Sequence, residues 1–283
     1  MKTLVINPTK EKIFESLKEA TLLNLSHFLL VGDKAKLIEK CYRYNIDSKL
    51  FSIYNITDDF EIIRFSQELI LNTKIDQIIF DDFPQKYQNQ ILNLNDENYK
   101  VIDIIDIPFL KHFLFVANIS KKQVNDYSDK KDTIYLAKDF MQKLGIKQVN
   151  VALISYENTK VDYLEASLVD LHIKKDGNLN IKIYDDFNIY NLFLFDSRIN
   201  IFNSKINLLV FKKYEASQIY LDTLKIFSNN TFASIILGDV YGIDFKKLKG
   251  KSDLLFTLSI LEKIYSEKVE KQEKQSPKEN IAT

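Results

Sequence analysis

Short apolar runs alternate with longer segments of helical period along most of this chain. In the first half, the pattern predicts strands at residues 28–31, 50–54, 77–80, 100–105 and 112–117. It predicts helices at residues 9–20, 34–44 and 58–71 and a shorter one after Pro84, and Asp33 is expected to cap the second. Strands that alternate with helices are typical of βαβ units. The sequence therefore predicts an α/β fold with a mostly parallel sheet.

The same pattern restarts after the polar segment at residues 120–129. It predicts strands at residues 150–155, 180–184, 207–211 and 232–237, and helices at residues 132–144, 161–174, 215–227 and 253–269. Gly145 and Gly177 follow two of these helices, as C-terminal glycine caps do. Residues 271–283 are polar and charged and contain a proline, so we expect this tail to be disordered.

Composition excludes several classes of protein. The chain has 283 residues, of which 46% are hydrophobic, so it can bury a large core and is not a disordered protein. Its 39 basic residues balance 39 acidic ones, and the zero net charge favours neither nucleic acid nor an anionic membrane as a partner. No signal peptide and no apolar segment of membrane-spanning length is evident, so we expect a soluble, cytoplasmic protein.

Cysteine and histidine are too few for a metal or disulfide framework. Cys41 is the single cysteine, and the three histidines, at positions 27, 112 and 172, do not have the spacing of zinc ligands. We therefore expect neither an internal disulfide nor a bound metal.

Four segments occur in an order that points to a known family. They are FLLVGDKAKLIEKCYRYNID (28–47), KHFLFVANI (111–119), the segment at residues 132–177, and EASQIYLDTLKIFSNNTFASIILG (215–238). Together they resemble the phosphate acetyltransferase and phosphate butyryltransferase (phosphotransacylase) family over residues 28–264, and the length is closer to the butyryl branch.

The resemblance implies a fold, a reaction and ligands. It implies a two-domain α/β/α fold with mostly parallel sheets, isopropylmalate-dehydrogenase-like, with residues 1–120 and the returning helix at 246–270 in one domain and 121–245 in the other. Enzymes of this family move an acyl group between CoA and inorganic phosphate. CoA, acyl phosphate and phosphate are then the small-molecule ligands, CoA is a substrate, and no cofactor is needed. The resemblance also implies a cleft between the domains and a homodimer or pairing with a homologue.

The sequence departs from the family at its ligand-binding motifs. Ser217 and Gln218 stand where the family has a Gly-Asn pair that opens the helix after the penultimate strand. Asp185 and Asp186 stand in place of the Gly-Pro of an Asp-Gly-Pro turn, where two carboxylates would repel an anionic substrate. The chain thus resembles a divergent member whose active-site motifs are eroded.

The third departure concerns a Ser-Arg pair that contacts the reacting groups. Aligned forward from Gly238, the pair falls at Lys247-Leu248, and aligned backward from Ser259 it falls at Leu248-Lys249. Lysine supplies the charge of arginine but not its planar two-pronged donor geometry. Lys247 and Lys249 are therefore the candidate catalytic residues.

Other candidates each have a simpler explanation. Gly250 and Lys251 would present amides and charge to a phosphate near a helix N-terminus, whereas a solvated loop in a lysine-rich protein explains the same residues. Ser217 and Gln218 are candidate donors at the start of a helix. Ser167 matches the Ser/Thr position of a family motif, although serine is often merely tolerated in a helix.

Two hypotheses of function remain. The first is an acyltransferase that exchanges acetyl- or butyryl-type groups between CoA and phosphate with an altered site. The second is a catalytically inactive relative that acts as a binding, regulatory or structural partner. The predicted scaffold supports both.

Overall fold

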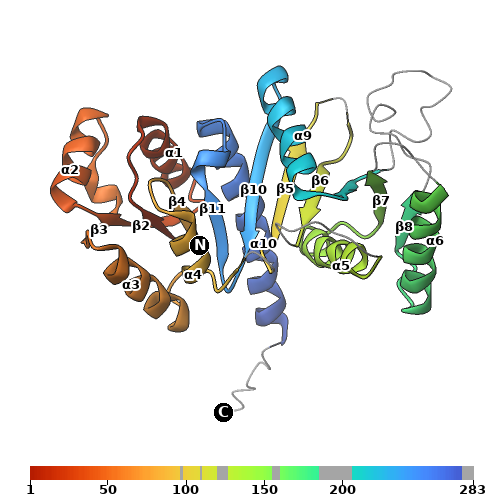
Figure 1. The fold of residues 1–283 in the computed structure, drawn as a ribbon. Coiled ribbons are helices and arrows are strands. Elements are labelled where there is room, and N and C mark those ends of the chain that lie inside the picture. Colours follow the sequence, from red (N-terminus) through yellow and green to blue (C-terminus); the bar gives the residue numbers. More distant parts are fainter. Residues whose placement is uncertain (96–97, 109, 120–126, 155–159, 185–205, 276–283) are drawn as a thin grey trace, which may run out of the picture.

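A computed structural model describes residues 1–95, 98–108, 110–119, 127–154, 160–184 and 206–275 (Figure 1). Its strands are β1 (Lys2–Ile6), β2 (His27–Gly32), β3 (Ser52–Asn55), β4 (Gln77–Phe80), β5 (Val101–Asp106), β6 (Leu114–Asn118), β7 (Val149–Ile154), β8 (Ile181–Tyr184), β9 (Leu208–Phe211), β10 (Thr231–Leu237) and β11 (Tyr241–Asp244). Its helices are α1 (Glu11–Leu22), α2 (Lys34–Arg43), α3 (Asp59–Leu71), α4 (Gln85–Ile91), α5 (Tyr127–Lys143), α6 (Lys160–Lys175), α9 (Tyr214–Phe227) and α10 (Lys251–Gln275), with short 3₁₀ helices η1 (Ser48–Leu50) and η2 (Phe245–Lys247).

All of these strands belong to one sheet, in the order β3-β2-β1-β4-β11-β10-β5-β6-β9-β7-β8. Most neighbouring strands are parallel, and the antiparallel pairs among the described strands are β5–β6, β5–β10 and β10–β11. The α/β class with a mostly parallel sheet is confirmed. Asp33 caps α2 as expected, because its side chain accepts a hydrogen bond from the Lys36 backbone at 3.2 Å.

Helices cover both faces of the sheet. Val5 of β1 belongs to the core that contains the buried residues of α1, α2, α5 and α10, whereas Leu4 and Ile6 belong to the core beneath α3 and α4. Successive side chains of a strand point to opposite faces, so these cores lie on opposite sides. Buried residues of β5, β6 and β10 pack with Leu221 of α9 in a third cluster. The result is an α/β/α layered molecule (Figure 1).

The middle of the sheet contains strands from distant parts of the chain. β11 pairs with β4, and β10 pairs with β5, so both lie between strands of the first half. The strands of residues 121–245 therefore do not form a sheet of their own. α10 contacts α1 and β10, and it ends at Gln275, so residues 271–275 of the predicted disordered tail are helical. Residues 276–283 lie outside the described part, and the domain boundaries at 120 and 245 stay predictions.

Two strands were not predicted. The residues of β1 that follow Lys2 are buried, but the run is short and lies at the start of the sequence. β11 is four residues, YGID, and its glycine and aspartate do not form an apolar run. Both strands are fixed by pairing with distant strands, a signal that local pattern does not carry.

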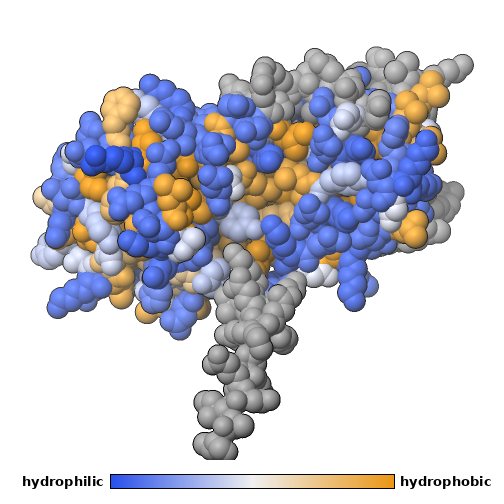
Figure 2. All heavy atoms as spheres, turned by 90° about the horizontal axis from the view of Figure 1, so that it is seen from below, coloured by the Kyte–Doolittle hydropathy of each residue, from blue (hydrophilic) through white to orange (hydrophobic). Residues whose placement is uncertain are grey.

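The surface is mixed in polarity. Figure 2 shows hydrophilic residues over both ends of the visible face, with apolar residues gathered towards the middle. Within the described ranges, the helices are too short or too polar to cross a lipid bilayer.

Candidate functional site

Lys247 lies in a cluster of polar and aromatic side chains beside the start of α9. Its ammonium donates hydrogen bonds to the hydroxyl of Tyr99 at 3.1 Å and to the hydroxyl of Tyr214 at 3.2 Å. It also lies 5.3 Å from the centre of the Tyr99 ring and 5.9 Å from that of Tyr214. The two rings pack edge to face, with 6.2 Å between their centres. Two hydroxyls and two aromatic rings therefore hold one positive charge in place.

Three separate elements bring these side chains together. Asp244 ends β11 and caps η2, since its side chain accepts from the Lys246 backbone at 3.1 Å. Phe245, the first residue of η2, is buried and anchors the turn that carries Lys247. Tyr99 is fully buried just before β5, and Tyr214 is the first residue of α9.

Four polar side chains lie buried nearby. Asp103 of β5 is directly opposite Ser234 of β10, on the face of the sheet that packs with α9. Asn118 ends β6, and its Oδ1 accepts a hydrogen bond from the Ser217 hydroxyl of α9 at 3.3 Å. The exposed fractions are 4% for Asp103, 3% for Ser234, 2% for Asn118 and 0% for Ser217.

Several of these buried atoms have no hydrogen-bond partner within the described residues. They are Asp103 Oδ2, Ser234 Oγ, Asn118 Nδ2 and, on α9, Gln218 Nε2. A buried polar atom left unpaired costs about 1–3 kcal/mol. Native proteins retain few such atoms, and functional sites are one place where they occur.

The charges in the cluster act on one another. Burial raises the pKa of the Asp103 carboxyl and of the Asp244 carboxyl, and Lys247 opposes both shifts. Burial alone would lower the pKa of Lys247, but the oxygens of Tyr99 and Tyr214 and the charge of Asp103 raise it by more. Burial also raises the pKa of Tyr99 to about 12. At neutral pH the lysine is therefore positively charged and the Tyr99 hydroxyl keeps its proton.

The predicted residues Ser217 and Gln218 lie at the same end of α9 as Tyr214, which contacts Lys247. Lys213, at the N-cap position, makes no side-chain hydrogen bond to the first turn of α9. The Ser217 hydroxyl donates to the backbone oxygen of Tyr214 at 2.7 Å. The positive end of the helix dipole therefore has no capping side chain here. An anion at this end would be favoured by the dipole.

Lys249 lies at the other end of α9. Its ammonium donates to the backbone oxygen of Ser228 at 3.1 Å and lies 4.8 Å from the centre of the Phe232 ring. Its backbone N–H donates to the buried carboxylate of Asp253 at 2.8 Å. A helix of 14 residues is about 20 Å long, so the structure does not bring the ammonium groups of Lys247 and Lys249 to one point.

Gly250 and Lys251 lie on the opposite face of the sheet from α9. Lys251, the first residue of α10, forms an ion pair with Glu19 of α1, and this contact raises the pKa of Lys251. A Cβ at Gly250 would lie 3.3 Å from the side chain of Lys12. These residues join α10 to α1, and their role in binding a ligand stays a prediction.

Ser167 lies far along the sheet from Lys247. It lines a groove of about 310 Å³ on α6, next to the edge strand β8, with Ala166, Asp170, Leu171, Lys174 and Ile183. The predicted role of Ser167 is thus separate in space from the Lys247 cluster. Asp185 and Asp186 lie outside the described residues.

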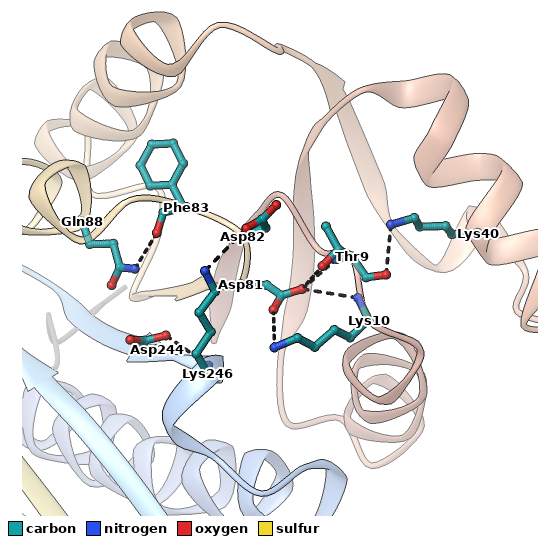
Figure 3. Close-up of polar contacts among 9 residues, drawn as sticks. All are labelled: Thr9, Lys10, Lys40, Asp81, Asp82, Phe83, Gln88, Asp244 and Lys246. Atoms are coloured by element: carbon teal, nitrogen blue, oxygen red, sulfur yellow. Dashed lines mark hydrogen bonds and ion pairs between the residues drawn. The ribbon is translucent and has the colours of Figure 1, made fainter. Parts of the chain in front are cut away.

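A second buried carboxylate lies where β1 and β4 end (Figure 3). Asp81 follows β4 and is 0% exposed, and its Oδ2 accepts from the Thr9 backbone at 2.7 Å, the Thr9 hydroxyl at 2.7 Å and the Lys10 backbone at 3.3 Å. The Lys10 ammonium lies 3.3 Å from its Oδ1. In Figure 3 this carboxylate points at Thr9 and Lys10, which precede α1, so it ties the segment that leads into that helix to the end of β4.

Two further lysines bind to groups next to the Asp81 cluster. Lys246 lies 3.5 Å from Asp82, and Lys40 donates to the backbone oxygen of Thr9 at 2.9 Å. Parallel α/β sheets bind ligands in the crevice where the strand order reverses, and here that point lies between β1 and β4. At this crevice the backbone amides of Thr9 and Lys10 already donate to Asp81, so they are not free to bind a ligand. We therefore interpret this cluster as structural.

Sequence reasoning missed Tyr99, Tyr214 and Asp103. Tyrosine is common in the chain, with 15 residues, so no single one stood out. Asp103 is the one charged residue within the apolar run VIDII (residues 101–105), and that interruption was the available signal. Within the described residues no group of three or more His, Cys, Asp or Glu has the arrangement of a metal site.

Comparison of the sequence with protein-family models and with curated proteins gives no match. Comparison of the structure with solved structures does give matches. A branched-chain phosphotransacylase from Enterococcus faecalis V583 matches with a TM-score of 0.73 at 12% identity, over 94% of this chain and 100% of the other. The chain has the phosphotransacylase fold. The phosphotransacetylase EutD from Staphylococcus aureus matches with a TM-score of 0.68 at 10% identity, over 94% of each chain.

The same architecture also occurs in a protein with different chemistry. A 4-hydroxythreonine-4-phosphate dehydrogenase from Burkholderia phymatum matches with a TM-score of 0.55 at 11% identity, over 93% of this chain and 98% of the other. Phosphotransacylase structures are the more similar, which agrees with the resemblance in sequence. Fold alone does not assign a reaction, so function must be argued from the site.

Proposed function

We propose that this protein is a phosphate acyltransferase, which moves an acetyl- or butyryl-type acyl group between CoA and inorganic phosphate. The observation that carries the proposal is the single positive charge of Lys247, held by Tyr99 and Tyr214 at the start of α9 in a phosphotransacylase fold. The similar structures are named as a branched-chain phosphotransacylase and a phosphotransacetylase. Their names support the reaction class for this chain.

The reaction needs what this cluster offers. In the direction of thioester formation, the CoA thiolate attacks the acyl carbon of an acyl phosphate, the carbon–sulfur bond forms, and the carbon–oxygen bond to phosphate breaks. Charge then develops on the departing phosphate, and a fixed cation stabilises it. We assign that role to Lys247, with Gln218 and the first-turn amides of α9 as hydrogen-bond donors, because the single hydroxyl hydrogen of Ser217 already binds the backbone oxygen of Tyr214. CoA is a substrate in this scheme, and no cofactor takes part.

A second function is favoured by a specific observation. Two of the three N–H donors of Lys247 already bind tyrosine hydroxyls, and the carboxyls of Asp103 and Asp244 act on the same charge. These groups reduce the attraction for phosphate. A catalytically inactive relative that serves as a binding, regulatory or structural partner is therefore the alternative. Under either function we propose a cytoplasmic protein that forms a homodimer or pairs with a homologue.

The test compares two lysines of one loop. Purified protein is mixed with CoA and acetyl, butyryl or longer acyl phosphates, and the loss of free thiol is followed. We expect Lys247→Met to lower kcat/KM by about 100-fold, the size of effect of losing one transition-state charge contact. Lys249→Met is the matched control and should change kcat/KM less than about threefold, because its ammonium lies at the far end of α9.

The outcomes separate the two functions. Turnover that Lys247→Met removes and Lys249→Met retains would support the acyltransferase. Equal effects of the two substitutions would remove Lys247 from the mechanism. No turnover with any acyl chain, from wild-type protein whose circular dichroism shows a folded α/β chain, would overturn the acyltransferase in favour of the inactive relative.

A further inference from the structure

Asp103 is the buried carboxyl of the Lys247 cluster, and it is poorly satisfied. It is 4% exposed, and its Oδ2 has no hydrogen-bond partner within the described residues. Tyr99 lies two residues before β5 and belongs to the same buried cluster as Val101 of that strand, and the hydroxyl of Tyr99 binds the ammonium of Lys247 at 3.1 Å. Val101 and Asp103 are alternate residues of β5 and share a face, so Asp103 lies on the face of the sheet against which Tyr99 packs.

The groups that act on Asp103 come from three elements. Lys247 of η2 and Lys225 of α9 are cations, and Asp222 of α9 is an anion. Ser234 of β10 is the directly opposed neutral residue, and its hydroxyl, like Lys247, opposes the rise that burial causes in the pKa of Asp103. Lys225 is itself paired with Asp222 at 3.3 Å, and Tyr99 and Tyr214 are bound to Lys247. Asp244 of β11 also acts on Lys247. Lys247 is thus the main positive charge that balances Asp103.

An anion beside Lys247 disturbs this balance. Two negative charges would then share one buried cation, and like charges at close range in a protein interior repel strongly. Asp103 has few ways to compensate, because its unpaired oxygen gains no stabilisation from a backbone amide. Asp81 differs, because its Oδ2 accepts from two backbone amides and a hydroxyl. The simplest relief is for the Asp103 carboxyl to bind a proton.

We infer that Asp103 takes up a proton when an anion binds beside Lys247, so that binding of the phosphate group in this site is coupled to protonation of the buried carboxyl. The inference rests on the proposed function, since it takes Lys247 as the residue that receives the anion. It adds a regulatory property: the site binds anions more tightly as the pH falls.

The test uses sulfate, which stays a dianion across the neutral range and so does not itself titrate. Isothermal titration calorimetry at about pH 7, in buffers of different ionisation enthalpy, gives the number of protons taken up on binding. For wild-type protein we expect a value between zero and one, and an affinity that rises roughly tenfold from about pH 8 to about pH 6.

Two variants assign the proton. Asp103→Asn keeps the shape of the side chain and removes its charge, so we expect no proton uptake and roughly tenfold tighter binding at about pH 8. Asp222→Asn is the matched control, because Asp222 also acts on Asp103 but its side chain is 66% exposed, and it should leave the proton uptake unchanged. Asp244→Asn tests the remaining carboxyl of the cluster and should likewise retain the uptake.

Each result has a distinct meaning. Sulfate binding without proton uptake, or uptake that persists in Asp103→Asn, would overturn this inference and leave the proposed function intact. If proton uptake is lost in Asp244→Asn but retained in Asp103→Asn, the proton binds to Asp244, and the inference about Asp103 is overturned as well. No sulfate binding, or binding that Lys247→Met does not weaken, would overturn the proposed function and this inference together.

Discussion

Asp81 and Asp103 are both buried aspartates of the same sheet, yet their surroundings are opposite. Asp81 follows β4, and its Oδ2 accepts from two backbone amides and a hydroxyl. Its Oδ1 has no hydrogen bond within the described residues but lies 3.3 Å from the ammonium of Lys10. Asp103 lies inside β5, with one oxygen unpaired, and the ammonium of Lys247, the cation that acts on it most, binds two tyrosine hydroxyls. A satisfied carboxylate stabilises the fold, whereas an unsatisfied one is retained at a cost that a function explains.

We expect the largest change in the free energy of unfolding from a substitution at Asp81. Replacing Asp81 with Ala leaves the Thr9 and Lys10 amides and the Lys10 ammonium without their acceptor. We expect the free energy of unfolding to fall by about 3 kcal/mol, because several charge-assisted hydrogen bonds are lost at a buried site. Urea denaturation measures it. A loss below about 1 kcal/mol would show that water replaces the carboxylate and that the contrast with Asp103 is not real.

Removing the charge of Asp103 should raise the free energy of unfolding, whereas removing that of Asp81 should lower it. Burial raises the pKa of this carboxyl in the folded state above its unfolded value, so its favourable contribution is present below the unfolded pKa and is lost as the pH rises through the folded pKa. We therefore expect Asp103→Asn to be more stable than wild type by about 1–2 kcal/mol at neutral pH. The difference should vanish in acid. Thermal unfolding over a pH series decides this, and a variant less stable than wild type at neutral pH would contradict it.

Breaking an ion pair at the surface should change the free energy of unfolding least. Lys251 and Glu19 join α10 to α1, and both side chains are more than one-third exposed. Lys251→Gln should lower the free energy of unfolding only slightly, and by much less than the Asp81 change, since solvent screens exposed pairs. Urea denaturation at low and high salt tests this, with the difference expected to shrink in salt. A larger, salt-insensitive loss would mean that packing of the lysine stem matters more than its charge.

The alternation of apolar runs and helical segments was enough to predict the α/β class and most elements. It did not reveal β1 or β11, because each is fixed by pairing with strands far away in sequence. For the candidate site, the sequence around residues 217 and 247 directed attention to the loop and the helix start that meet at Lys247 and Tyr214. They gave no information on Tyr99 or Asp103, which reach the cluster only through the sheet register.

The comparison between Lys247 and Lys249 shows the same limit. Both lie in one short lysine-rich loop, and the sequence offered no reason to prefer either. The structure directs one ammonium to the start of α9 and the other to its end. Their separation follows from the turn at η2 and from the buried Phe245, a feature that a count of charges does not contain.

The position of β10 and β11 has a consequence for how the chain folds. β4 and β5 are close in sequence, but they are separated in the sheet by two strands that are synthesised much later. The first half therefore cannot complete its sheet on the ribosome until residues 231–244 have emerged. Contacts between such distant residues slow folding and leave strand edges open meanwhile. The exposed edges of β4 and β5 are thus the places where a nascent chain of this protein is most open to aggregation or to a chaperone.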